Sequence, residues 1–452
     1  MPSPVGVCVA LDDDALADDP VWTRLDDPAG YRLVTGWQTS RGRQSELDKT
    51  GTGTSEVDMI DLAGILDPTN ATGPFAGKLN PGLQAAIALR NPVTDTWSQI
   101  FRGFTGEWDG DLDPTARMQT VALQLADAFD VFTALEMTPG NQGDTAPAES
   151  EGDIYYAATT GIRQVANRIN QALDDAGWPA AWRRIFTGNV QLQGSTYARL
   201  DQLLTVIQDA ADAEFPGVAN AYMSKDGLVV FHGRFARFTP ELYQSPDDAS
   251  RDAGNSIVFW EAGSRDVAAA DGSVAAITGL SWRRSVSDIV NACLCLPRGV
   301  DASDVPGSLV TDAASIAQYG WRSLSFEDLL VEKSEAPVDD AVGDCKLYST
   351  YYVQNYAQPH TRVTTLSFKG RKPTDPLAPA LWKLMCGVEI GDVLHLKTSH
   401  FGGLGGFDED FYVEGIRYTA APQQEGSDAY PELTMELDVS PAALYTVNPF
   451  GS

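Results

Sequence analysis

The chain has 452 residues, of which 43% are hydrophobic and 21% are charged, a balance that fits a globular protein of two to four domains and excludes wholesale disorder. Its formal net charge of -30 argues against binding to nucleic acid or to anionic membranes through a basic surface. The acidic balance indicates either simple solubility or a high-salt setting, or else a surface that keeps DNA from adhering.

The cysteines and the N-terminus indicate where the protein folds. The five cysteines are odd in number and lack the spacing of a disulfide framework, which predicts folding in a reducing cytoplasm. The opening residues, MPSPVGVCVALDDD, lack the basic and apolar regions of a signal peptide. No apolar run approaches the roughly 20 residues that span a bilayer. We therefore expect a soluble protein made in the cytoplasm, with no cofactor and no direct membrane insertion.

Residues 1–137 are predicted to form an N-terminal β-barrel of the tube type. An acidic run in the first 19 residues is typical of a solvated loop, and strand-like segments follow at 21–38 and 55–62. Gly51 and Gly53 precede a strand rather than a helix and complete no phosphate-loop motif. Within 79–127, three segments with roughly alternating polarity and Gly, Pro, Asn and Asp between them predict three strands.

In the middle of the chain, the spacing of the hydrophobic residues becomes that of α-helices. Residues 138–153, rich in Pro, Gly and acidic residues, predict a linker, and residues 154–240 predict a small α+β domain. Two helices are expected there, the first with Thr160 as N-cap and Gly177 at its end, the second with Ser195 as N-cap. The hairpin that follows turns at Asp226 and Gly227.

The C-terminal half, 241–440, is predicted to hold a second β-barrel with a mixed helical and loop insertion around 300–345, followed by a tail at 441–452. Paired strands are expected in 277–297, with Cys293 and Cys295 on one buried strand face. Residues 389–440 then repeat the order of 79–127. Each has a turn glycine before an aliphatic strand, an aromatic strand that contains a glycine, and a closing strand with aliphatic residues at every second position; the glycines are Gly82 and Gly103 in the first copy and Gly391 and Gly415 in the second.

No arrangement of residues demands catalysis, and we assign no catalytic, cofactor-binding or metal-binding residue. The four histidines form no HExxH or zinc-type spacing, so a metal at His395 and His400 is a minor alternative. Acidic clusters such as Glu107 with Asp109, or 408–410, are expected in a chain with 62 acidic residues. The tryptophans are interpreted as core residues rather than sugar platforms; they include Trp22, Trp37, Trp97, Trp108 and Trp282.

Several segments in a fixed order resemble one known family. They are SRGRQSELDKTGTGTSEVDMIDLAGILDPTNATGPFAGKLNPG with IFRGFTGEW, then FPGVANAYMSKDGLVVFHGR, DAASIAQYGWRSLS, and DFYVEGIRYTAAP with ELDVSPAALY. Together they cover most of the chain and resemble the hub proteins at the tail tip of long-tailed bacteriophages, of the actinobacterial-phage minor tail protein type. That family is similar to the central hub of contractile-tail baseplates and to the base of type VI secretion spikes.

The resemblance implies a structural virion protein of the phage tail tip, assembled in the host cytoplasm, that forms a homotrimer with two similar β-barrels per chain. Three chains would give a pseudo-sixfold ring that adapts the sixfold tail tube to threefold tip components. The implied partners are tube-end, tape measure and receptor-binding proteins, and DNA would pass an acidic channel without specific binding. The alternative is a carbohydrate-acting or carbohydrate-binding tail protein, suggested by the aromatic residues and paired carboxylates.

Overall fold

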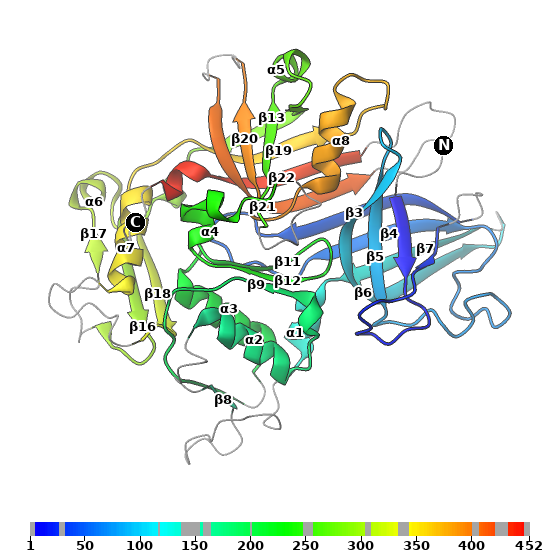
Figure 1. Ribbon diagram of the computed structural model, residues 1–452, viewed down its shortest axis with the longest axis horizontal. Helices are drawn as coiled ribbons and strands as arrows, with labels where there is room; N and C mark the ends of the chain where they lie inside the picture. The colour runs from blue at the N-terminus through cyan, green and yellow to red at the C-terminus, as the bar shows by residue number, and fades with distance from the viewer. Residues whose placement is uncertain are drawn as a thin grey trace.

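The structure is a computed structural model that describes most of the chain. The described residues are 5–26, 32–115, 118–136, 154–156, 164–198, 201–246, 256–302, 309–332, 343–399, 406–420 and 433–446. The predicted linker 138–153 and the last six residues of the predicted tail lie outside them. Strands predominate, and Figure 1 shows two β modules with an α+β unit beside them, so the predicted mainly β class is confirmed.

The first β module is built from strands that follow the predicted hydrophobic alternation. It contains β1 (Val5–Val9), β2 (Thr23–Arg24), β3 (Arg32–Gly42), β4 (Thr54–Asp61), β5 (Gln84–Asn91), β6 (Thr96–Asp113) and β7 (Met118–Ala126), and α1 (Ala128–Ala134) follows it. β5, β6 and β7 are the three strands predicted within 79–127, and they pair antiparallel in that order. The long strand β6 pairs with β5 through its first half and with β7 through its second half, on opposite edges.

The α+β unit packs two helices against a small sheet. Its elements are β8 (Ile154–Tyr156), α2 (Val165–Asp175), η2 (Ala180–Trp182), β9 (Arg183–Ile185), β10 (Ser195–Tyr197), α3 (Leu203–Glu214), β11 (Asn220–Met223), β12 (Val229–His232), α4 (Phe235–Phe238) and η3 (Pro240–Tyr243). Gly177, with a φ of 70°, ends α2, and Gly227, with a φ of 80°, forms the β11–β12 turn, as predicted.

The second β module repeats the first near the C-terminus. It contains β13 (Phe259–Gly263), α5 (Arg265–Ala270), β14 (Ala275–Ala276), β15 (Gly279–Arg283), β19 (Arg362–Lys369), α8 (Ala378–Gly387), β20 (Val393–Lys397), β21 (Asp408–Ala420) and β22 (Leu433–Pro441), with η9 (Ala442–Tyr445) after it. The strands β20, β21 and β22 pair antiparallel in sequence order, as β5, β6 and β7 do.

A small unit is inserted between β15 and β19. It holds η5 (Val286–Asp288), β16 (Ala292–Pro297), β17 (Val310–Thr311), α6 (Ala313–Tyr319), β18 (Ser323–Leu329) and α7 (Asp344–Tyr356). β16 pairs with β17 and β18, and α7 contributes a run of buried tyrosines against this sheet. Cys293 and Cys295 are both fully buried, as the prediction of a shared strand face requires.

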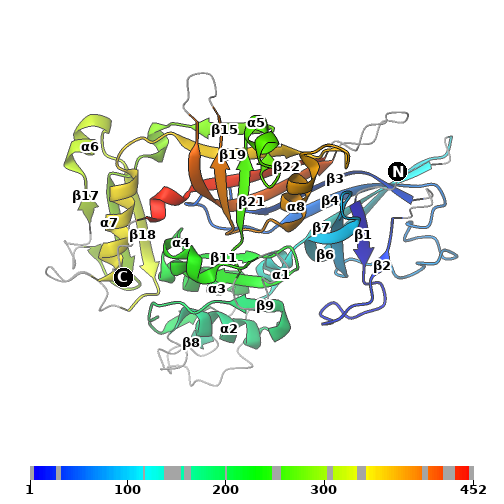
Figure 2. The ribbon, with the colours of Figure 1, turned by 45° about the horizontal axis from the view of Figure 1, so that its top comes forward.

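One continuous sheet contains the strands of both modules. Its order is β14-β13-β20-β21-β3-β4-β7-β6-β5-β1-β2, with β22 on β21, β19 on β22 and β15 on β19. The two predicted barrels are therefore similar β modules of one 14-stranded sheet, and neither closes on itself among the described strands. Figure 2 shows the α+β unit lying on one side of the strands where the modules meet. In the described part of the chain, no helix is long and apolar enough to cross a membrane.

Three local predictions are wrong. Ser195 lies in strand β10 and accepts a hydrogen bond from the Arg168 side chain, while α3 begins only at Leu203 with Gln202 as its N-cap. The predicted strands within 277–297 exist as β15 and β16, but they pair with different sheets. Trp97 and Trp282 are 42% and 48% exposed rather than part of the core. Thr160 lies outside the described residues.

Candidate functional site

The two β modules are equivalent at the level of single hydrogen bonds. The N–H of Gly82 donates to the carbonyl of Thr105 at 2.7 Å, and the N–H of Gly391 donates to the carbonyl of Val413 at 2.8 Å. Both glycines have positive φ angles, 81° and 87°, which favour glycine. Thr105 and Val413 are thus equivalent positions on β6 and β21, and the predicted repeat is confirmed.

The strands around these positions match in register. Val57 pairs with Leu123 in the first module, and Leu366 pairs with Leu437 in the second, with all four side chains buried. β4 and β7 therefore correspond to β19 and β22. The glycines inside the aromatic strands do not correspond, because Gly103 precedes Thr105 by two residues whereas Gly415 follows Val413 by two.

The modules are joined by a pairing of β3 with β21. Six residues of each strand pair antiparallel, from Gly42 opposite Gly415 to Trp37 opposite Ala420. The Trp37 and Tyr418 rings stack across this joint with centroids 5.7 Å apart and an interplanar angle of 28°. We call this pairing the internal joint. It connects eight strands into one continuous wall, in the order β15-β19-β22-β21-β3-β4-β7-β6.

Gly42 is required at the internal joint. Its φ is 90°, and a Cβ atom there would lie 2.3 Å from the carbonyl oxygen of Glu414. We expect Gly42→Ala to destabilise the fold by about 1–3 kcal/mol or more, since backbone strain and a backbone clash add. Urea unfolding would measure this loss. Gly51→Ala is the matched control, because a Cβ at Gly51 meets nothing within 4 Å; an equal effect of both substitutions would contradict the account.

One face of the wall is polar and the other is apolar, because side chains alternate along each strand. The apolar side is the core formed by residues such as Val57, Leu123 and Leu437. The polar face, as we call the opposite side, includes Gln38, Ser40, Glu56, Asp58, Glu107, Asp109, Asp111, Gln124, Thr365, Ser367, Lys369, Arg417, Thr419, Thr434, Glu436 and Asp438.

Negative charge predominates on the polar face. Its basic members are Arg417, which is engaged by Asp438 at 2.9 Å and by Glu436 at 3.4 Å, and the exposed Lys369 opposite Thr434. Burial and the neighbouring Glu56 charge raise the pKa of Asp58 above its usual value. A shallow groove of about 690 Å³ crosses the internal joint on this face; its lining includes the carboxylates of Glu56, Glu107 and Asp130, the guanidinium of Arg417, and the apolar Leu125 and Ala126. Such a surface repels phosphate groups instead of binding them.

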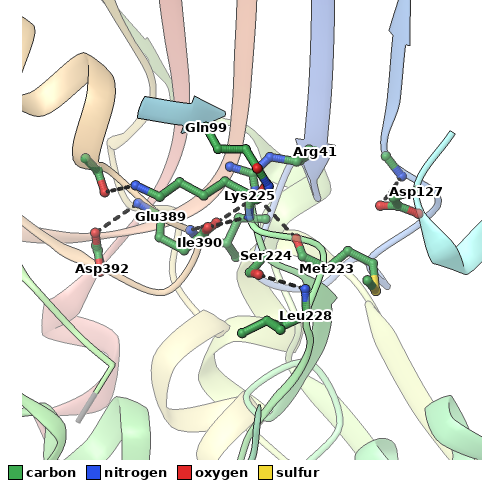
Figure 3. A network of polar contacts seen from close by, with 12 residues as sticks. Arg41, Gln99, Asp127, Met223, Ser224, Lys225, Leu228, Glu389, Ile390 and Asp392 are labelled. Atoms are coloured by element: carbon green, nitrogen blue, oxygen red, sulfur yellow. Dashed lines mark hydrogen bonds and ion pairs between the residues drawn. The ribbon is translucent and has the colours of Figure 1, made fainter. Parts of the chain in front are cut away.

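A buried clamp joins the modules to the α+β unit (Figure 3). Arg41 of β3 donates to the Glu389 carboxylate at 2.7 Å, and the same carboxylate accepts the backbone N–H of Lys225 at 2.7 Å. Although burial alone would lower the pKa of Arg41, the Glu389 charge raises it. Gln99 of the first module donates to the Lys225 carbonyl at 3.0 Å. Residues from three parts of the chain therefore meet at the β11–β12 turn.

The Lys225 side chain extends the clamp to the second module. Its Nζ donates to the carbonyl oxygens of Cys386 and Gly387 at 3.1 and 3.2 Å. These carbonyls belong to the last turn of α8, whose backbone acceptors lack partners within the helix, so a cation is favoured there. The clamp fixes how the hairpin and the two modules lie relative to each other.

A second buried group holds the internal joint from the side of β21. The fully buried carboxylate of Glu414 accepts hydrogen bonds from Arg43 at 2.8 Å, Arg237 at 2.9 Å and Ser440 at 2.5 Å. Burial alone would raise the pKa of Glu414, but the two guanidinium groups lower it to about 2. The Arg237 guanidinium also stacks over the Tyr412 ring at 4.4 Å.

The acidic residues singled out in the sequence fall in two places. Glu107 and Asp109 lie on the polar face, and Asp408 and Asp410 flank His395 at 3.0 and 2.7 Å at the exposed end of β21. His400 lies outside the described residues. Across the described ranges, no group of three or more His, Cys, Asp and Glu side chains could hold a metal ion.

Sequence reasoning missed the buried Arg41, Arg43, Glu389 and Glu414. Charged residues within strands are ordinarily assigned to the solvent face, so the alternation alone gave no signal for them. The available hint is that Arg41 and Arg43 lie in SRGRQ, and Glu414 in DFYVEG, within segments that carry the family resemblance.

The fold is shared with known phage and prophage tail proteins. A tail protein from Neisseria meningitidis MC58 is 12% identical over 98% of each chain with a TM-score of 0.55. The 43 kDa tail protein of prophage MuSo2 from Shewanella oneidensis is 9% identical over 98% of this chain and 99% of that one, with a TM-score of 0.52. The half-lidded Francisella PdpA-VgrG complex follows with 8% identity over 97% of this chain and 58% of that one, at a TM-score of 0.49. No protein-family model matches the sequence, and no similar sequence was found among curated proteins. The expected resemblance is thus confirmed as a shared fold with phage tail proteins.

Proposed function

We propose that this protein is a structural, non-enzymatic component of a bacteriophage tail and that three copies form the hub at the tail tip. The observation that carries the proposal is the internal joint, which aligns two equivalent modules side by side in one wall. A chain of this kind presents nearly the same surface twice. Three such chains in a closed ring would present it six times, which suits an adaptor between a sixfold tube and threefold tip components.

The polar face gives the ring a path for DNA. If the polar face lines the central channel of the ring, its carboxylates repel the phosphate backbone of DNA. The scarcity of basic side chains leaves no strong contact at which DNA would stall. The net charge of -30 then has a function beyond solubility.

The remaining parts of the chain would serve assembly. We divide the chain into a first β module at 1–137, an α+β unit at 154–240 and a second β module at 241–440. The modules would contact the end of the tail tube and the tape measure protein, and the α+β unit and the inserted unit would contact tip and receptor-binding proteins. The protein would be assembled in the host cytoplasm and then reside in the virion.

Native mass spectrometry of the purified chain tests this proposal. We expect a species of three times the 48.6 kDa chain mass, alone or after addition of other tail proteins. Light scattering over a range of concentrations provides the control for weak association. A chain that stays monomeric in both settings and is absent from purified virions would contradict the proposal.

A further inference from the structure

Two strand edges of the wall have no partner strand in the part of the chain that the structure describes. β15 pairs with β19 on one side, and no described strand pairs with its other side. β6 is covered by β5 only up to Phe104, so the same edge of residues 106–112 is open among the strands that the structure describes. These two edges are the two ends of the eight-stranded wall, and among the described strands they do not pair with each other.

The equivalents of these two edges do meet, at the internal joint. Gly36 of β3 pairs with Asp58 of β4, and Gly279 of β15 pairs with Ser367 of β19, so β3 and β15 hold the same place in their modules. β21 is the equivalent of β6, and β20 covers it only as far as Tyr412. Beyond that point β3 covers the open edge of β21. A strand equivalent to β3 should therefore fit the open edge of β6.

We propose that β15 of one copy pairs antiparallel with residues 106–112 of β6 of a second copy, in the register of the internal joint. This inference rests on the proposed function, for which it specifies the contact between subunits. Trp37 lies opposite Ala420 in the internal joint, and the equivalent pair is Leu280 of one copy opposite Leu112 of the next. Leu112 is 68% exposed in the single chain and becomes covered.

The chemistry of the two edges is complementary. Arg283 and Arg284 at the end of β15 are exposed basic neighbours in a chain with 32 basic and 62 acidic residues. The open edge of β6 carries Glu107, Asp109 and Asp111, all exposed. Charge complementarity of this kind favours the correct partner and register. A long open edge also tends to pair with other chains, so a specific partner protects it from aggregation.

The joint is head-to-tail, because it uses two different edges. Such contacts generate either a closed ring or an open filament. Closure after three copies belongs to the proposed function, whereas the identity and register of the paired edges are the content of this inference. The two statements can fail separately.

Disulfide cross-linking tests the register. In a Cys8→Ser background, the Leu112→Cys and Leu280→Cys double variant should form covalent multimers under mild oxidation, ending at the covalent trimer. Each single variant is the control and should form none, because two copies of one edge do not meet. Two results would overturn this joint and leave the proposed function standing. The first is a protein that is a trimer by native mass but forms no cross-link in the Leu112→Cys and Leu280→Cys variant. The second is a higher cross-link yield in a Leu112→Cys and Ser281→Cys variant, whose register is shifted by one residue.

Charge reversal tests the edges without a new covalent bond. Arg283→Glu with Arg284→Glu should weaken assembly at least tenfold, and adding Asp109→Arg with Asp111→Arg should restore it. The matched control is Lys372→Glu with Lys383→Glu, the same charge change at exposed positions away from both edges. Unchanged assembly of the Arg283 and Arg284 variant, or no rescue by the swap, would overturn the joint. A wild-type chain that never assembles would instead contradict the proposed function.

Discussion

Glu414→Ala should destabilise the folded chain by about 3–5 kcal/mol, because it leaves buried guanidinium groups without their counter-charge. Arg43 and Arg237 are almost fully buried, and both donate to this carboxylate. Water cannot take the place of the Glu414 carboxylate unless the internal joint opens beside Gly415. Urea unfolding followed by circular dichroism measures the change. The control is Glu436→Ala, because Glu436 is half-exposed and forms its ion pair with Arg417 at the surface. This substitution should change stability by less than about 0.5 kcal/mol.

The same carboxylate predicts a dependence of stability on pH. Its pKa is about 2 in the folded chain, below the ordinary value of 4.5, so folding favours the charged form. The stabilisation is therefore complete above about pH 4.5 and is lost as the pH falls toward 2. Glu414→Gln should flatten the stability profile in that window. An unchanged profile in this variant would contradict the assignment of the buried charge pair.

Glu389→Ala should cost a similar amount, about 3–5 kcal/mol, with a different local signature. It removes the acceptor for the buried Arg41 side chain and for the Lys225 N–H at once. Hydrogen exchange should therefore accelerate first at the β11–β12 turn, since the clamp holds that turn between the modules. Equilibrium unfolding gives the size of the loss.

The control for this prediction is Asp375→Ala, which removes a partly exposed ion pair with Arg371. It should leave exchange at the β11–β12 turn unchanged. If Glu389→Ala were as mild as this control, or accelerated exchange evenly over the whole chain, the clamp would not hold the three parts together.

The sequence predicts the repeated module and the hairpin because both depend on local signals. Positive φ at Gly82, Gly391 and Gly227 follows from turn chemistry, and the strands follow from alternation. The internal joint leaves no such signal, since pairing between β3 and β21 joins residues more than 370 positions apart in the chain. Its location depends on which edges remain open after each module has formed.

The errors have similar causes. Ser195 is a good helix cap by composition, but the strand pairing of β10 with β8 and the Arg168 contact compete for it. β15 and β16 are adjacent in sequence, yet β16 pairs with the strands of the inserted unit. The buried charged residues of the site could not be predicted because their partners come from distant segments, such as Arg43 with Glu414.

Electron cryomicroscopy of the assembled protein, alone or in the tail tip, tests the central claim most directly. We predict a closed ring of three chains with six similar β modules, β15 of each chain beside β6 of the next, and the polar face toward the hole. A ring whose subunits meet through other surfaces, or one with the polar face on the outside, would contradict it.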